Sequence, residues 1–128
     1  MYEISIEEEF AGAHFLKNYK GKCEKLHGHN WKVVITISGE TLGKDGLLID
    51  FKIIRDKLKK ILEKLDHNYL NNIPFFKKIN PSSENIAFYI FQKLKVSIKD
   101  FPVKIKKVTV WENNKQSASY IENKQEKN

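Results

Sequence analysis

A single cysteine lies close to a pair of histidines in the run Cys23-Glu24-Lys25-Leu26-His27-Gly28-His29. Residues two apart on a β-strand point to the same face, so His27 and His29 can converge on one metal ion. Gly28 between them leaves room for a close approach of the backbone. The chemistry open to Cys23 is that of a nucleophile, a base or a fourth metal ligand.

A third imidazole is available at His14, which ends a stretch that alternates apolar and polar residues from Tyr2 onward. Three neutral imidazoles with an open fourth position are typical of a catalytic zinc, whereas three imidazoles and a thiolate make a closed structural site. The spacing alone is compatible with a catalytic site and with a structural site. The competing interpretation of His-Gly-His is a polar turn without a metal, but the addition of Cys23 and His14 favours a metal site.

Two further groups of residues could move or hold protons. In the pair Asp66-His67, the carboxylate can fix the tautomer of the imidazole and raise its basicity, which is how a proton-relay histidine is supported. The same pair follows a predicted helix, where an imidazole near the C-terminus is also common capping chemistry. Both interpretations stay open.

Glu112 is predicted to lie on the apolar face of a strand. The apolar parity of segment 103–112 slips across Lys106-Lys107, which indicates a β-bulge, and after the slip Glu112 shares a face with Val108 and Val110. A carboxylate on the apolar side of a strand is costly without a partner. Glu112 therefore either lies at a frayed strand end or meets a cationic or hydrogen-bond-donating ligand.

Hydrophobic periodicity predicts the elements that position these residues. Asp50 is a plausible N-cap for the first helix; Ser82 and Ser83 suit the start of the second, where Glu84 favours the helix dipole. His27 and His29 lie just ahead of the second predicted strand. The pattern gives, in chain order, strands at 2–10 and 30–38, a helix at 51–65, a helix after Ser83, and strands at 103–112 and 117–121.

The composition limits the expected number of domains, the partners and the cellular location of the protein. The 128 residues predict one domain over 1–121 with a polar tail at 122–128. A net charge of +7 comes from scattered lysines with a lone arginine, so we expect no nucleic-acid partner. One cysteine excludes an intramolecular disulfide, and Met1 leads into a strand pattern. We expect a cytoplasmic protein, without a membrane span because no apolar stretch approaches about 20 residues.

Taken together, the chain resembles the family of 6-pyruvoyl-tetrahydropterin and 6-carboxy-tetrahydropterin synthases. The resemblance covers nearly the whole chain, and its specificity comes from several short motifs in the same order. These are Phe10-x3-His14, Cys23-x3-His27-Gly28-His29-Asn30, Leu48-Ile49-Asp50-Phe51, Leu65-Asp66-His67-x2-Leu70-Asn71, Pro81-Ser82-Ser83-Glu84-Asn85 and the late Glu112.

The resemblance implies an α+β protein with the T-fold. In this fold a four-stranded antiparallel sheet carries two helices on one face, in the order strand, strand, helix, helix, strand, strand. The order matches that read from the periodicity. In the family, three sheets close into a barrel and two trimers stack, so the resemblance also implies a homohexamer, which would remove exposed sheet edges.

The resemblance also implies roles for individual residues. His14, His27 and His29 would bind Zn²⁺, and Cys23 would be the catalytic base. Asp66 and His67 of a neighbouring subunit would be its relay partners. Glu112 would anchor the guanidine-like edge of a pterin ring. Ser82, Ser83 and Glu84 match a segment that closes around the pterin, where threonine is usual at one or both serine positions.

The spacing Cys23-x3-His27 resembles the bacterial 6-carboxy branch, which serves 7-deazaguanine and queuosine synthesis from 7,8-dihydroneopterin triphosphate. The 6-pyruvoyl branch spaces its cysteine further from the histidine pair. A third branch uses a glutamate ahead of the pair to cleave dihydroneopterin for folate synthesis, and Glu24 could supply that group. The alternative outside enzymes is a small zinc-stabilised module in which Cys23 is a structural ligand.

Overall fold

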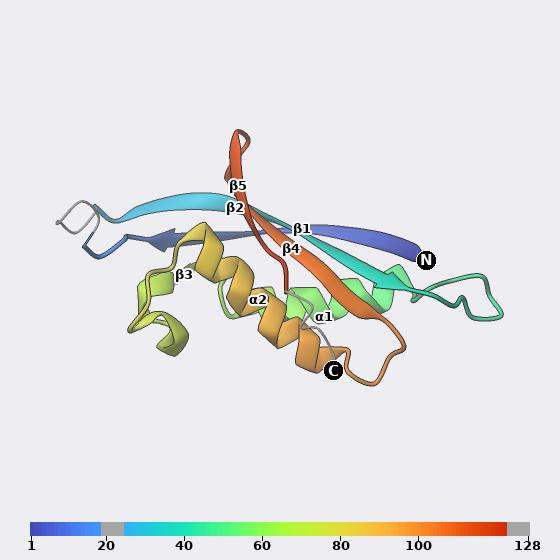
Figure 1. The fold of residues 1–128 in the computed structure, drawn as a ribbon. Helices are drawn as coiled ribbons and strands as arrows, with labels where there is room; N and C mark the ends of the chain where they lie inside the picture. Colours follow the sequence, from blue (N-terminus) through green and yellow to red (C-terminus); the bar gives the residue numbers. More distant parts are fainter. Residues whose placement is uncertain (19–24, 123–128) are drawn as a thin grey trace, which may run out of the picture.

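Two long strands form the centre of the sheet. The computed structural model describes residues 1–18 and 25–122. Within it, β1 (Tyr2–His14) and β2 (His27–Gly39) pair antiparallel along their whole length, from Tyr2 opposite Gly39 to His14 opposite His27. Figure 1 shows this pair running across the molecule. Both strands extend further than their alternating patterns predicted, so His27 and His29 lie within β2 and not ahead of it.

The sheet is mixed and has five strands among the described residues, in the order β3-β1-β2-β4-β5. Strand β4 (Lys104–Asn113) pairs antiparallel with β2, and β5 (Gln116–Tyr120) pairs antiparallel with β4. The expectation of four antiparallel strands is wrong in one detail, because β3 (Asn68–Tyr69) pairs parallel with β1. A strand of two residues is too short to produce an alternating pattern.

Two helices lie on one face of the sheet, as predicted (Figure 1). Helix α1 (Phe51–Glu63) begins at Asp50, whose side chain accepts a hydrogen bond from the Lys52 amide. Helix α2 (Ser83–Ser97) begins at Ser82, whose hydroxyl accepts one from the Asn85 amide. Two short 3₁₀ helices, η1 (Leu70–Asn72) and η2 (Pro74–Phe76), connect β3 to α2.

The bulge predicted from the parity slip is present. Thr36 pairs with Lys107 and Ile37 with Ile105, so Lys106 is the extra residue on β4. The slip keeps Val108 and Val110 buried, and they join the inward residues of β2 and both helices in one hydrophobic core.

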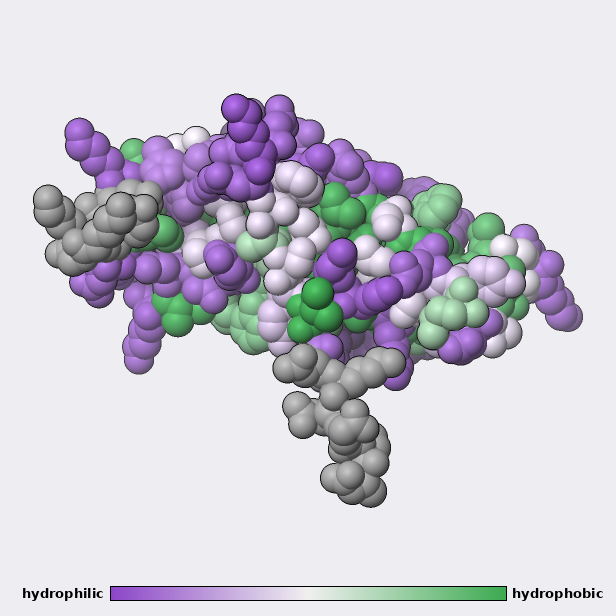
Figure 2. Space-filling view, turned by 45° about the horizontal axis from the view of Figure 1, so that its top comes forward, coloured by the Kyte–Doolittle hydropathy of each residue, from purple (hydrophilic) through white to green (hydrophobic). Residues whose placement is uncertain are grey.

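One face of the molecule is largely hydrophilic. Figure 2 shows hydrophilic side chains over most of the visible face, with hydrophobic residues in small groups between them. Among the described residues, no helix is both long enough and apolar enough to cross a membrane.

Trp31 links the core to the histidine-bearing ends of the strands. Its side chain is fully buried, and its indole Nε1 donates a hydrogen bond to the Gly12 carbonyl oxygen at 3.1 Å. We expect Trp31→Phe to lower the free energy of unfolding by about 1–3 kcal/mol, because the buried carbonyl loses its partner. Urea denaturation measures this loss. Trp111→Phe is the matched control, and equal losses in both variants would contradict the role of the Trp31 hydrogen bond.

Candidate metal centre and active site

Three imidazoles meet where β1 and β2 end their pairing. His27 and His29 are two apart on β2 and share its inward face, and His14 lies directly opposite His27 on β1. The Nε2 atoms of His14 and His27 are 3.1 Å apart. The ring centres of His29 and His14 are separated by 5.3 Å. The structure therefore brings together the three histidines that the sequence singled out.

Backbone carbonyls fix the tautomers of two of these rings. Nδ1 of His14 lies 2.7 Å from the Pro81 carbonyl oxygen, and Nδ1 of His27 lies 2.8 Å from that of Lys25. A carbonyl oxygen can only accept, so each Nδ1 carries the hydrogen and each Nε2 presents a lone pair. This is how metal-binding histidines are commonly oriented by groups behind them.

The environment of His14 favours the neutral imidazole. Burial lowers the pKa of His14, an effect to which the neighbouring His27 and His29 add, while the hydrogen bond to Pro81 and the charge of Glu112 oppose it. Its side chain is 2% exposed. A metal ligand must be the neutral base, so burial prepares His14 for coordination.

Glu112 is the fourth member of the group. Its Oε2 lies 3.2 Å from Nε2 of His29 and 3.6 Å from Nε2 of His14. Glu112 lies one residue before the end of β4, where the strand turns into β5. Sequence reasoning placed Glu112 on the apolar face but missed its imidazole neighbours. The pairing of Lys32 with Trp111, which sets Glu112 beside the histidine-bearing part of β2, depends on the bulge and could not be read locally.

The donor set could hold a metal ion. The candidate ligand atoms of His14, His27, His29 and Glu112 all lie within 4.8 Å of one another. A tetrahedral zinc site with ligand distances of about 2.0–2.1 Å has ligand atoms about 3.3 Å apart. The separations of 3.1, 3.2 and 3.6 Å between these atoms are close to that spacing. Imidazole nitrogen and carboxylate oxygen are both ordinary zinc ligands.

Asp66 and His67 form a separate pair beyond the end of α1, whose C-cap is Lys64. Asp66 Oδ1 accepts a hydrogen bond from the Ala11 amide at 2.8 Å, and its Oδ2 lies 3.0 Å from Nδ1 of His67. The pKa of Asp66 is lowered, mainly by the hydrogen bond from the Ala11 amide, and the interaction with His67 lowers it further. The carboxylate thus orients His67, whose side chain is 81% exposed, leaving Nε2 available to a reactant.

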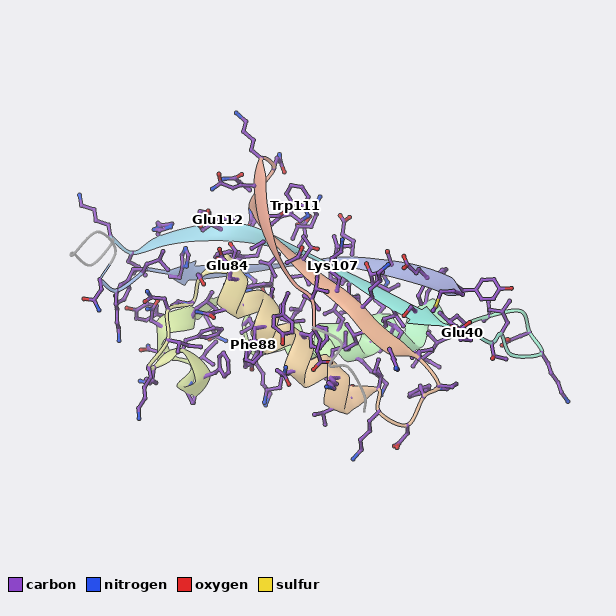
Figure 3. All side chains as sticks on the ribbon, viewed as in Figure 1. Glu40, Glu84, Phe88, Lys107, Trp111 and Glu112 are labelled. Carbon is purple, nitrogen blue, oxygen red and sulfur yellow. The ribbon has the colours of Figure 1, made fainter. Side chains whose placement is uncertain are left out.

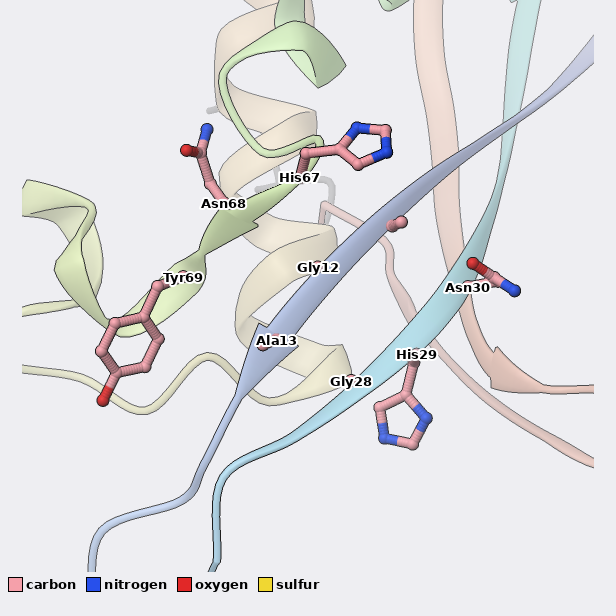
Figure 4. Close-up of a pocket in the computed structure, with 9 residues that line it drawn as sticks. Gly12, Ala13, Gly28, His29, Asn30, His67, Asn68 and Tyr69 are labelled. Atoms are coloured by element: carbon pink, nitrogen blue, oxygen red, sulfur yellow. The ribbon is translucent and has the colours of Figure 1, made fainter.

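A hollow of about 520 Å³ lies beside this pair, lined by His67, His29 and small residues of β1 and β2 that include Gly12 and Gly28. Figure 4 shows the His67 ring pointing sideways from β3, while the His29 ring points from β2 away from His67. Within one chain, the Asp66-His67 pair therefore does not face the histidine cluster. Cys23 lies outside the described residues.

Comparison with known proteins identifies the family. The model of the 6-pyruvoyl tetrahydropterin synthase family matches residues 3–123, nearly the whole chain. The chain belongs to this family. The resemblance that the motifs predicted is confirmed.

Relatives in the family carry more than one name. A 6-carboxy-5,6,7,8-tetrahydropterin synthase from Haemophilus influenzae is 31% identical over 95% of this chain and 100% of its own length. A 6-pyruvoyl tetrahydrobiopterin synthase from Dictyostelium discoideum is 33% identical over 88% and 78%. The structure of the Caenorhabditis elegans 6-pyruvoyl tetrahydropterin synthase superposes with a TM-score of 0.79, at 26% identity, covering 96% of this chain and 98% of that one.

The segment that the family resemblance assigned to the pterin lies at the start of α2. Ser82 caps the helix, Ser83 is half-buried and Glu84 is exposed. The preceding residue, Pro81, supplies the carbonyl that holds His14. Figure 3 places Glu84 and Glu112 toward the same end of the molecule and Glu40 toward the other. The start of α2 therefore adjoins the candidate metal centre.

Proposed function

We propose that this chain is a zinc-dependent 6-carboxy-5,6,7,8-tetrahydropterin synthase, a lyase that acts on 7,8-dihydroneopterin triphosphate in 7-deazaguanine and queuosine synthesis. The observation that carries the proposal is the cluster of three oriented imidazoles at the paired ends of β1 and β2. The spacing Cys23-x3-His27 and the name of the Haemophilus influenzae relative support the 6-carboxy branch.

The metal would be held by His14, His27 and His29. Bound there, zinc would supply a Lewis acid that acidifies the hydroxyls and the adjacent C–H of the substrate side chain. Cys23 is the proposed base that removes a proton from the substrate. Lys22 and Lys25 beside it favour the thiolate, and Glu24 opposes it.

The proposed relay partner of Cys23 is His67. Asp66 accepts the hydrogen bond from Nδ1 of His67, so Nε2 can give or take a proton at the substrate. Because the His29 ring points away from His67 in Figure 4, we propose that the Asp66-His67 pair serves the site of a neighbouring subunit in a homohexamer.

The remaining residues are proposed to bind the substrate. Glu112 would accept hydrogen bonds from the ring N–H groups of the pterin, which are charge-assisted and therefore strong. Ser82, Ser83 and Glu84 would close around the ring from the start of α2. The net charge of +7 would attract the triphosphate.

A second enzymatic candidate is cleavage of the dihydroneopterin side chain by Glu24. A relative from Pyrococcus furiosus that is 33% identical over 87% of this chain and 90% of its own length is named dihydroneopterin monophosphate aldolase. The direct succession Cys23-Glu24 offers both kinds of base. A 6-pyruvoyl product is the third possibility, given the names of other relatives.

Product analysis decides between these activities. We expect purified, zinc-loaded protein incubated with 7,8-dihydroneopterin triphosphate to yield 6-carboxy-tetrahydropterin, identified by chromatography and mass spectrometry. A 6-pyruvoyl product would show that the chain has the activity of the 6-pyruvoyl branch. A 6-hydroxymethyl product would show side-chain cleavage and assign the role of base to Glu24. Retained metal without any product, in the intact oligomer, would favour the zinc-stabilised module.

A further inference from the structure

A groove of about 580 Å³ runs between α1 and α2. Its lining residues on α1 recur at spacings of three and four, from Ile53 to the C-cap Lys64. Those on α2 are four apart, from Tyr89 to Ser97. Residues at these spacings form one stripe along a helix, and the stripe on α1 spans about 16 Å. The groove is therefore elongated and follows both helices.

The groove carries an excess of positive charge. It is lined by four lysines, which are Lys57, Lys60, Lys64 and Lys93. The carboxylate of Asp56, which also lines it, is already paired with Lys52 at 3.1 Å. Within residues 1–18 and 25–122, none of the four ammonium groups has a carboxylate at ion-pair distance. The groove can therefore attract acidic groups from outside the chain.

Apolar and aromatic groups lie between the lysines. Ile53 is 39% exposed, and Ile61 is half-buried beside it on the same stripe. Tyr89 is 5% exposed, and its hydroxyl has no hydrogen-bond partner among the described residues. Burial raises the pKa of Tyr89, so the hydroxyl stays protonated and can donate. Nζ of Lys93 lies 5.6 Å from the centre of the Tyr89 ring, which places a cation near this donor.

We propose that this groove binds an acidic amphipathic helix of a partner protein. The valley between two packed helices accepts the ridge of a third, and an amphipathic helix lays its apolar face into such a groove. Apolar side chains of the partner cover Ile53 and Ile61, while its carboxylates pair with the flanking lysines. The lysines of α1 extend over about 10 Å of the helix axis, which suits charges repeated along a helix better than one compact anion.

The composition of the groove disfavours other occupants. A second copy of the chain does not supply the helix, because α1 and α2 both carry more basic than acidic residues. Sites for single-stranded nucleic acid combine basic residues with several aromatic platforms on which bases stack. The described lining of this groove holds one aromatic side chain, Tyr89, and no arginine. The groove is built by other residues than the candidate metal centre, so the inference does not depend on the proposed function.

Charge reversal at one lysine tests the site. The probe is a fluorescently labelled helical peptide of about 14 residues, with leucines along one face and glutamates beside them. We expect Lys60→Glu to weaken its binding to the intact protein at least about 10-fold in fluorescence anisotropy, because an attractive pair becomes a repulsive one. Lys59→Glu is the matched control, since Lys59 is an exposed neighbour on α1 that does not line the groove. Equal weakening by both substitutions would overturn the site.

Two further substitutions test the contacts between the lysines. We expect Ile53→Ser to weaken peptide binding about 10-fold through lost apolar burial. We expect Tyr89→Phe to weaken it to a similar degree, about 10-fold, through loss of a hydrogen bond to a carboxylate. Val96→Ser is the control, because Val96 is 68% exposed on α2 outside the groove. Circular dichroism checks that each variant is folded, and affinities equal to that of Val96→Ser would overturn these contacts.

Two other probes test the class of partner. A peptide of the same composition, reordered so that its leucines surround the helix, should bind at least about 10-fold more weakly. Equal binding of both peptides would overturn the amphipathic helix. Binding of a single-stranded oligonucleotide of equal charge as tightly as the peptide, with the same loss in Lys60→Glu, would overturn the assignment to a protein partner. None of these measurements uses turnover or bound metal, so failure of the proposed function is recognised separately.

Discussion

His27→Ala is expected to abolish both metal binding and turnover, whereas Cys23→Ala is expected to keep the metal and lose only turnover. The Lys25 carbonyl orients the His27 ring, and Nε2 of His27 lies 3.1 Å from Nε2 of His14. The substitution therefore removes one of the three imidazole ligands. Loss of a catalytic base costs about 100- to 10,000-fold in rate. Zinc content by atomic emission and turnover of 7,8-dihydroneopterin triphosphate are the two measurements.

The comparison between these variants separates an enzyme from a structural module. Circular dichroism of both variants checks that the sheet and helices persist, and Glu40→Gln serves as a substitution outside the cluster. Equal loss of zinc from His27→Ala and Cys23→Ala would make Cys23 a metal ligand. That result would contradict its role as a base and favour the closed Cys-His₃ site.

Mixing two inactive variants, Cys23→Ala and His67→Ala, is expected to restore part of the activity. If each site takes Cys23 from one subunit and Asp66-His67 from another, random exchange in an equimolar mixture gives about one quarter of sites with both halves intact. The expected recovery is therefore about one quarter of the unmodified activity. Turnover before and after exchange measures it, with exchange followed by mass spectrometry of the native oligomers.

A mixture of Cys23→Ala with His27→Ala is the matched control. In the proposed arrangement, Cys23 and the histidine cluster of one site come from the same subunit. Exchange between these two variants then restores no complete site, and the mixture should stay inactive. If exchange is complete and the Cys23→Ala and His67→Ala mixture also stays inactive, the relay operates within one chain and the shared site is wrong.

Local patterns in the sequence determined most of the elements and several of their boundaries. Alternation predicted the centres of the long strands. Helical spacing with Asp50 predicted the start of α1, and the Ser82-Ser83 pair predicted the start of α2 to within one residue. The slip across Lys106-Lys107 predicted the bulge. These features depend on side chains close together in the chain, which is why they could be read without the fold. The histidines of the cluster were also predictable, because His27 and His29 are two apart on one strand.

Only the tertiary structure decided how the site is completed. The paired ends of β1 and β2 lack an alternating apolar pattern because they carry small residues and histidines. They form strands because each supplies backbone hydrogen-bond partners to the other. Glu112 reaches His29 through the register of β4 on β2, His14 is oriented by Pro81, and Asp66 binds the Ala11 amide. Each of these contacts joins segments far apart in the sequence. Residue types and spacing therefore determined which chemistry was available, while long-range backbone pairing determined which groups could act together.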